Sequence, residues 1–153
     1  MASFWQSKTK TTACDNKKKA LQNILSRGVS CTATETKMEE ADLLNSQNKL
    51  EKAYRIYKDV LGQNPSHVNA LFGIGVILEK QKQFDLAIQF LSRAIETDPD
   101  KSQALLARGR IFRLQGILGK AIADFTEVIS NYPDHFEALI ARGIAFGQTS
   151  QFN

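Results

Sequence analysis

The stretch ALLARGRIF at residues 104–112 recurs at residues 138–146 as ALIARGIAF. Six of the nine positions are identical. A fixed period of about 34 residues is typical of proteins that stack copies of one small structural unit. The repetition therefore predicts an array of similar units.

The three prolines of the chain follow the same period, because Pro65, Pro99 and Pro133 are separated by the interval that separates the two stretches. Proline lacks an amide hydrogen and pushes the preceding residue out of the helical region. Each proline is therefore expected to mark the end of a helix. The residues directly after the prolines are expected to cap the next helix through a side-chain oxygen; they are Ser66, Asp100 and Asp134.

Between the prolines, apolar residues recur at steps of three and four, as they do on amphipathic helices. The polar run EKQKQ at 79–83 divides the second unit into two helices, and the third unit has the same layout. Glycine inside a helix costs about 1 kcal/mol relative to alanine, so its return in register predicts close packing between helices. The small residues in register are Ala41, Gly75, Gly109 and Gly143, and separately Ala53, Ala87 and Ala121.

The period, the two helices per unit and the positions of the small residues and prolines resemble the tetratricopeptide repeat. The resemblance implies an all-α superhelix, a solenoid of antiparallel helix pairs with about three and a half repeats. The repeats would span 34–67, 68–101, 102–135 and, as a half repeat, 136–153. Residues 1–33 would form a separate N-terminal segment.

In this family the first helix of each repeat lines a concave groove that binds a segment of another protein. The resemblance implies that the partner-binding residues are Asn69, Phe72, Val76, Gln103, Leu106, Arg110, Arg113, Ile140 and Ile144. It also implies an acidic end of the groove, formed by Glu35, Glu39 and Asp42.

Within this groove, Phe72, Val76 and Leu106 are expected to act as apolar anchors for a bound segment. Arg110 and Arg113 are expected to pair with its acidic side chains. An alternative stays open, in which Phe72 and Val76 pack against the neighbouring helix and the arginines are solvated.

Family members that bind chaperones grip the C-terminus of a heat-shock protein with Lys, Asn and Arg side chains, the carboxylate clamp. In this chain the clamp positions hold Met38, Asp42, Gly73, Gln103 and Ala107. If the clamp starts one repeat later, they hold Phe72, Val76, Ala107, Glu137 and Ala141. Neither set matches, so the sequence predicts an adaptor that is not a carboxylate-clamp co-chaperone.

Arg108 and Arg142 directly precede the recurring glycines. This position predicts an internal role, in which each arginine pairs with an acid on the second helix of its repeat. Asp124 is the candidate partner of Arg108.

Charge is distributed unevenly along the chain. Residues 1–33 contain six basic groups and one acid, whereas residues 34–153 contain 14 basic and 15 acidic groups. A nearly neutral repeat domain argues against a nucleic-acid surface on it. The segment 1–33 is expected to be flexible and basic with a helix at 15–27, and a transit peptide or a nuclear contact remain alternatives.

No combination of residues predicts an enzyme, a cofactor or a metal site. His67 and His135, the only histidines, each lie two residues after a proline and are interpreted as residues of the cap region. The chain lacks an apolar run long enough to span a membrane and a secretory signal. Cys14 and Cys31 are interpreted as free thiols in the cytoplasm.

The partner is therefore expected to be a protein or peptide segment. Two other hypotheses remain. The chain could be one end of a larger protein whose remainder holds further repeats or an enzyme domain. It could also self-associate through an open C-terminal end, because Leu139, Ile140 and Phe146 lack the second helix of their own repeat.

Overall fold

A computed structural model of the chain describes residues 33–150. This part contains seven helices and no strand. The helices are α2 (Ala33–Ser46), α3 (Leu50–Gln63), α4 (Val68–Lys80), α5 (Phe84–Thr97), α6 (Ser102–Leu114), α7 (Leu118–Asn131) and α8 (Phe136–Thr149). From Thr36 onward they belong to one compact unit. The helix predicted at 15–27 lies outside the described residues.

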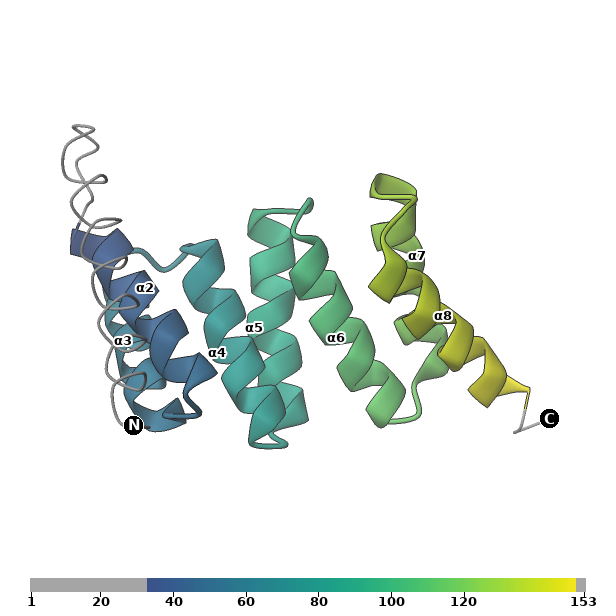
Figure 1. Cartoon of the computed structure of the whole chain (residues 1–153), viewed down its shortest axis with the longest axis horizontal. Helices are drawn as coiled ribbons and strands as arrows, with labels where there is room; N and C mark the ends of the chain where they lie inside the picture. Colours follow the sequence, from purple (N-terminus) through teal and green to yellow (C-terminus); the bar gives the residue numbers. More distant parts are fainter. Residues whose placement is uncertain (1–32, 151–153) are drawn as a thin grey trace, which may run out of the picture. The chain divides into compact units, whose positions relative to one another are not determined.

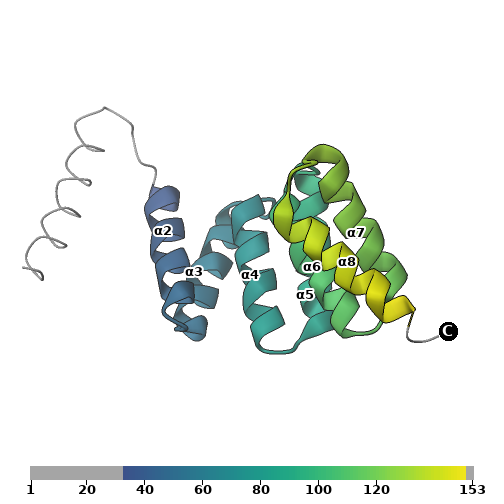
Figure 2. The same cartoon turned by 45° about the vertical axis from the view of Figure 1, so that its right-hand side comes forward.

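Helices that are neighbours in the sequence are also neighbours in space (Figure 1). Contacts join α3 to α4, and continue in chain order to α8. The first helices of adjacent repeats also touch, α4 with α6 and α6 with α8. Figure 2 shows α8 beside α6 and α7, the two helices that it contacts. The prediction of an all-α stack of helix pairs is confirmed.

Each proline lies in the turn between one repeat and the next, as predicted, because no helix includes Pro65, Pro99 or Pro133. Histidines cap two of the helices that follow. Nδ1 of His67 accepts a hydrogen bond from the amide of Ala70 at the start of α4 (3.3 Å). His135 caps α8 in the same way.

The prediction that Ser66, Asp100 and Asp134 cap these helices is wrong. The cap position of each helix is one residue further along the chain. The residue after the proline still belongs to the turn, since the amide of Ser66 donates to the side chain of Asn64 (3.1 Å). In the next repeat the amide of Asp100 donates to the side chain of Asp98 in the same way (3.2 Å).

The recurring glycines permit close contact between the two helices of a repeat, as predicted. A Cβ added to Gly75 would lie 2.7 Å from the side chain of Leu91 on α5. A Cβ added to Gly109 would lie 2.6 Å from the ring of Phe125 on α7. Gly143 on α8 differs, because no atom lies within 4 Å of its Cβ position.

The second helices α3, α5 and α7 bury the same three positions, a small residue followed by a large apolar residue and a third apolar residue. All of these side chains are at most 1 % exposed. Full burial of one large apolar side chain stabilises a fold by about 1.5–3 kcal/mol. The residues are Ala53, Tyr57 and Val60; Ala87, Leu91 and Ala94; and Ala121, Phe125 and Val128.

The turn between the two helices of a repeat contains a left-handed residue at one position. Asn48, Lys82 and Gly116 have φ angles of 59°, 60° and 76°, and they occupy equivalent positions in successive repeats. Glycine adopts this conformation without steric cost and asparagine tolerates it, whereas lysine is strained there. The same turn geometry therefore recurs although its residue changes.

Candidate functional site

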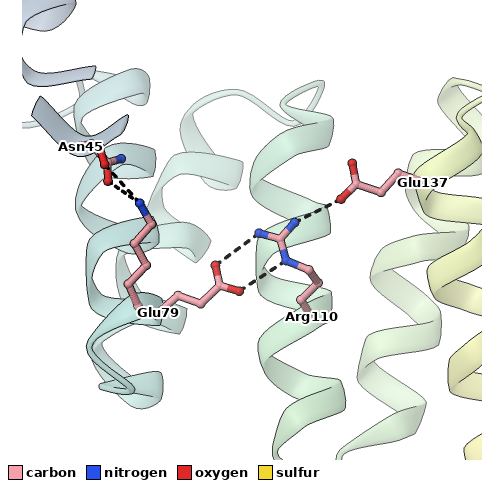
Figure 3. Close-up of polar contacts among 5 residues, drawn as sticks. Asn45, Glu79, Arg110 and Glu137 are labelled. Carbon is pink, nitrogen blue, oxygen red and sulfur yellow. Dashed lines mark hydrogen bonds and ion pairs between the residues drawn. The ribbon is translucent and has the colours of Figure 1, made fainter. Parts of the chain in front are cut away.

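A row of polar contacts joins the first helices of the four repeats (Figure 3). Nζ of Lys80 on α4 donates to Oδ1 of Asn45 on α2 (2.7 Å). Glu79, also on α4, accepts two hydrogen bonds of 3.3 Å from Arg110 on α6. Arg110 donates a further bond to Glu137 on α8 (3.2 Å). The row marks a face shared by α2, α4, α6 and α8.

The sequence predicted that Arg110 pairs with acids of a bound segment. In the structure it pairs instead with two acids of its own chain, Glu79 and Glu137. They reach it because α4 and α8 both lie against α6. Partly exposed ion pairs of this kind stabilise a fold by only about 0–1 kcal/mol. Their main effect is to neutralise Arg110 and to hold its side chain in place.

A cleft of about 320 Å³ lies between α6 and α8. It is lined by Arg110, Arg113, Phe136, Glu137, Ile140, Ala141 and Ile144. Its apolar side chains are open to solvent, because Phe136 is 75 % exposed, Ile140 47 % and Ile144 48 %. The structure thus brings together four predicted site residues, Arg110, Arg113, Ile140 and Ile144.

Arg113 is the second arginine of this cleft, which we call the α6–α8 cleft. No acid in residues 33–150 forms an ion pair with it. Its Nε is buried and has no hydrogen-bond partner in this part of the chain. A buried donor without an acceptor costs about 1–3 kcal/mol.

A second cleft, of about 510 Å³, lies between α4 and α6. Arg110 lines both clefts, so the two adjoin. Of the predicted site residues, Val76 and Arg110 lie here, and Val76 is half-buried. The lining residues are Val76, Glu79, Lys80, Lys82, Phe84, Arg110 and Leu114.

Asn69 and Phe72 of α4 are occupied by Lys101, which lies just before α6. Nζ of Lys101 donates to Oδ1 of Asn69 (2.7 Å). It also lies 5.7 Å from the centre of the Phe72 ring, within cation–π range. Phe72 packs partly against the core, so the packing alternative describes it better than the anchor alternative. Gln103 is exposed on α6.

The prediction that Leu106 is an apolar anchor is wrong, because its side chain is only 3 % exposed. Leu106 belongs to a core cluster together with Leu105 and Phe112 of the same helix. Ala141 of α8 packs against that cluster. The approach of α8 to α6 therefore closes the surface that Leu106 would need.

Arg108 pairs internally with Asp124 on α7, as predicted. Nε and one terminal nitrogen of Arg108 donate to the two carboxylate oxygens, at 2.9 and 2.7 Å. The hydrogen bond to Asp124 raises the pKa of Arg108, whereas burial lowers it. Arg142 holds the same position on α8, but no ion pair joins it to another described residue.

Of the three residues predicted to form an acidic end of the groove, Asp42 is already engaged by a hydrogen bond within the chain. Glu39 and Asp42 are exposed on α2 and line neither cleft, and Glu35 lies in the first turn of that helix. Asp42 accepts a hydrogen bond from the hydroxyl of Tyr57 on α3. Burial raises the pKa of Tyr57, and the hydrogen bond and negative charge of Asp42 raise it further.

Sequence reasoning missed two aromatic residues that line the clefts, Phe136 and Phe84. Phe136 opens α8 and is the most exposed of the large apolar residues in the described part of the chain. Its counterparts in the preceding repeats are Val68 and Ser102, so no periodic pattern marked the position. The sequence did contain one signal for this position, because Phe136 stands where the previous repeat has Ser102.

Residues 33–150 were also compared with the features of metal-binding and membrane-spanning proteins. This part of the chain contains no group of three or more His, Cys, Asp or Glu side chains that could hold a metal ion. None of its helices is long and apolar enough to cross a membrane.

Two family profiles, each described as tetratricopeptide repeat, match the sequence at residues 44–111 and 91–136. Together they span more than half of the chain. The chain belongs to the tetratricopeptide repeat (TPR) family. No curated protein matches the sequence of this TPR chain.

Solved TPR domains share its fold. The TPR domain of Arabidopsis OM64 is 20 % identical with a TM-score of 0.72, over 76 % of this chain and 96 % of that one. The first TPR of Spaghetti (RPAP3), bound to the HSP90 peptide SRMEEVD, is 18 % identical with a TM-score of 0.73, over 76 % and 93 %. The second TPR domain of human RPAP3, in complex with the HSP70 peptide SGPTIEEVD, is 19 % identical with a TM-score of 0.66, over 71 % and 91 %. At these identities the likeness establishes the fold alone.

Proposed function

We propose that this TPR chain is a non-catalytic interaction module that binds a segment of a partner protein in the α6–α8 cleft. The observation behind the proposal is an unusual surface. Three exposed apolar side chains, Phe136, Ile140 and Ile144, line the cleft beside an arginine whose Nε has no acceptor in the described part of the chain. Exposed apolar residues next to a polar group with unused hydrogen-bonding capacity are typical of a peptide-binding site.

The chemistry of the cleft defines the segment that fits it. An apolar side chain of the partner would pack against Ile140 and Ile144. A backbone carbonyl or a carboxylate next to it would accept a hydrogen bond from Arg113. Because the cleft is formed by two helices that are already packed, the chain would lose little conformational freedom on binding.

The same geometry argues against a carboxylate clamp. Of the clamp positions in the first alignment, Met38, Gly73 and Ala107 are buried. In the alignment one repeat later, Glu137 replaces a cation and already accepts a bond from Arg110. Neither alignment presents a lysine or arginine to a terminal carboxylate.

The proposal is tested by Ile144→Asp in affinity capture from cell extract, with captured proteins quantified by mass spectrometry. A charge buried under a bound apolar side chain typically costs about 2 kcal/mol or more, roughly a thirtyfold loss of affinity. Capture of the specific partners should therefore fall to background.

Leu86→Asp is the matched control, because Leu86 on α5 is also about half exposed but does not line the cleft. It should keep the partners that Ile144→Asp loses. Circular dichroism verifies that both variants are folded. Equal capture by the wild type and Ile144→Asp would refute binding in this cleft.

A further inference from the structure

The cleft between α4 and α6, which we call the α4–α6 cleft, contains two residues that depart from the repeat pattern. The first is Leu114, the last residue of α6, which is 59 % exposed. Among the large apolar residues of 33–150, only Phe136 is more exposed. The equivalent positions of the other repeats hold the polar residues Ser46, Lys80 and Gln148. The packing of the repeat therefore does not require an apolar residue here.

The second departure is Lys82, in the turn between α4 and α5. Its φ angle of 60° strains a lysine, whereas the equivalent residues Asn48 and Gly116 tolerate the left-handed conformation. Strained residues cluster at functional sites. Lys82 and Leu114 belong to different repeats and line the same cleft. Two departures in one place indicate a function of this cleft that the repeat architecture does not explain.

The charges that line the α4–α6 cleft are unbalanced. Glu79, the one acid among its lining residues in the described chain, is paired with Arg110 (Figure 3). Lys80 donates to Asn45, which carries no charge. Neither Lys80 nor Lys82 forms an ion pair within residues 33–150. The two ammonium groups favour an acidic ligand, because charges across a binding interface are complementary.

The remaining lining residues are apolar. Val76 and Phe84 are half-buried, and Leu114 adds an exposed side chain from the opposite helix. The volume of about 510 Å³ leaves room for a large side chain. The ring of Phe84 favours an aromatic one, since aromatic rings attract each other beyond the gain from apolar burial.

We propose that the α4–α6 cleft binds an extended segment of a partner protein that carries an aromatic residue and, two positions away, an acid. Side chains two positions apart in an extended segment point to the same side, so both would enter the cleft. The aromatic side chain would pack between Phe84 and Leu114, and the carboxylate would pair with Lys82. The proposal does not depend on binding in the α6–α8 cleft.

Other segments of this chain suit the cleft less well than a partner does. Residues 1–33 contain six basic groups and one acid, so their charge has the same sign as that of the cleft. A further repeat would stack on α8, because contacts between helices follow chain order and both α4 and α6 already have neighbours on either side. The cleft is therefore open because of its own side chains, wherever the chain ends.

The test uses a defined probe, the peptide SGWSESG with an acetylated N-terminus and an amidated C-terminus. It places glutamate two positions after tryptophan and has no terminal carboxylate. In an NMR titration of the full chain, saturable shift changes should centre on the end of α4, the turn at 81–83 and the end of α6. A peptide with lysine in place of the glutamate should bind about fivefold more weakly or less.

Two of the variants that make the test specific install residues that other repeats already have. Lys82→Asn should unfold at no lower temperature than the wild type, because asparagine tolerates the turn, and should bind the peptide about threefold more weakly. Leu114→Ser should abolish saturable binding by removing the apolar contact. Lys82→Glu should weaken binding about tenfold, and the lysine peptide should restore it by exchanging the charges.

Two control variants should bind the peptide as the wild type does. Lys52→Glu makes the same charge change at an exposed lysine of α3 that does not line the cleft. Ile144→Asp blocks the α6–α8 cleft, so the two proposals fail independently. Absence of saturable shifts at about 5 mM peptide, or undiminished binding to Leu114→Ser, would overturn the proposal. Dimers that dissociate in Leu114→Ser would also overturn it, because a second copy would then occupy the cleft.

Cross-linking with a carbodiimide, which joins a lysine to a carboxylate in direct contact, distinguishes a partner from this chain. In cell extract, mass spectrometry should find Lys82 joined to an acid that lies two positions from an aromatic residue of another protein. A cross-link from Lys82 to an acid of its own polypeptide outside residues 33–150 would overturn the proposal.

Discussion

Gly109 and Gly143 occupy the same position in their repeats but have different surroundings. On α6 the ring of Phe125 packs so closely that a methyl group at Gly109 would lie 2.6 Å from it. On α8 the corresponding space is open. Helical glycine is unfavourable in itself, so only the contact with a second helix can compensate for it.

The same substitution should therefore have opposite effects at the two positions. Gly109→Ala should lower the free energy of unfolding by about 1–3 kcal/mol, because Phe125 must move. Gly143→Ala should raise it by up to about 1 kcal/mol, because alanine favours the helix and meets no other atom. Urea denaturation followed by circular dichroism measures both changes.

Gly147→Ala serves as a control for helix propensity alone, since its Cβ position is also free of neighbours. It should resemble Gly143→Ala. A loss of stability in Gly143→Ala similar to that in Gly109→Ala would show that the space above Gly143 is filled.

At the scale of helices, the Arg108–Asp124 pair fixes α6 to α7. Asp124 is 5 % exposed and makes two hydrogen bonds, of 2.9 and 2.7 Å, to Arg108. Arg108 makes a further bond to Ser92 on α5 (3.0 Å). One guanidinium therefore connects three helices and is partly removed from water.

Removing the acid should leave a partly buried cation without its partner. Asp124→Ala is expected to lower the free energy of unfolding by about 2–4 kcal/mol. Glu137→Ala removes an exposed partner of Arg110 and should cost less than about 1 kcal/mol. Urea denaturation of both variants in parallel provides the comparison, and equal losses would contradict the structural distinction between the two pairs.

At the scale of the whole molecule, residues 34–153 are nearly neutral, with 14 basic and 15 acidic groups. Several cations on the first helices, or directly before them, are already engaged within the chain: Lys80 by Asn45, Lys101 by Asn69, and Arg110 by two acids. A terminal carboxylate would therefore meet few free positive charges.

We expect the peptide SRMEEVD, which the first TPR of Spaghetti (RPAP3) binds, not to bind this chain. Isothermal titration calorimetry with both proteins tests this, with the Spaghetti domain as the positive control. Its binding should be measurable under conditions in which this chain gives no saturable heat. Comparable binding by both proteins would refute the argument from the clamp positions.

Much of the fold could be predicted from the sequence. The register of Pro65, Pro99 and Pro133 located the turns, and the small residues located the close contact between paired helices. Arg108 and Asp124 could be matched for the same reason, since they lie at fixed positions on the two helices of one repeat. Backbone sterics and helix periodicity act over short distances, and the repeat shows them several times.

The sequence by itself determined the helices, the repeat and the packing of each helix pair. Tertiary structure alone decided that Leu106 is buried, that Arg110 is neutralised and that Phe136, Ile140 and Ile144 gather beside Arg113. These outcomes depend on contacts between first helices of different repeats, such as the contact of Arg110 on α6 with Glu79 on α4. Side chains at such contacts vary from repeat to repeat, so no periodic pattern predicts them, and only the placement of the helices sets which of them meet.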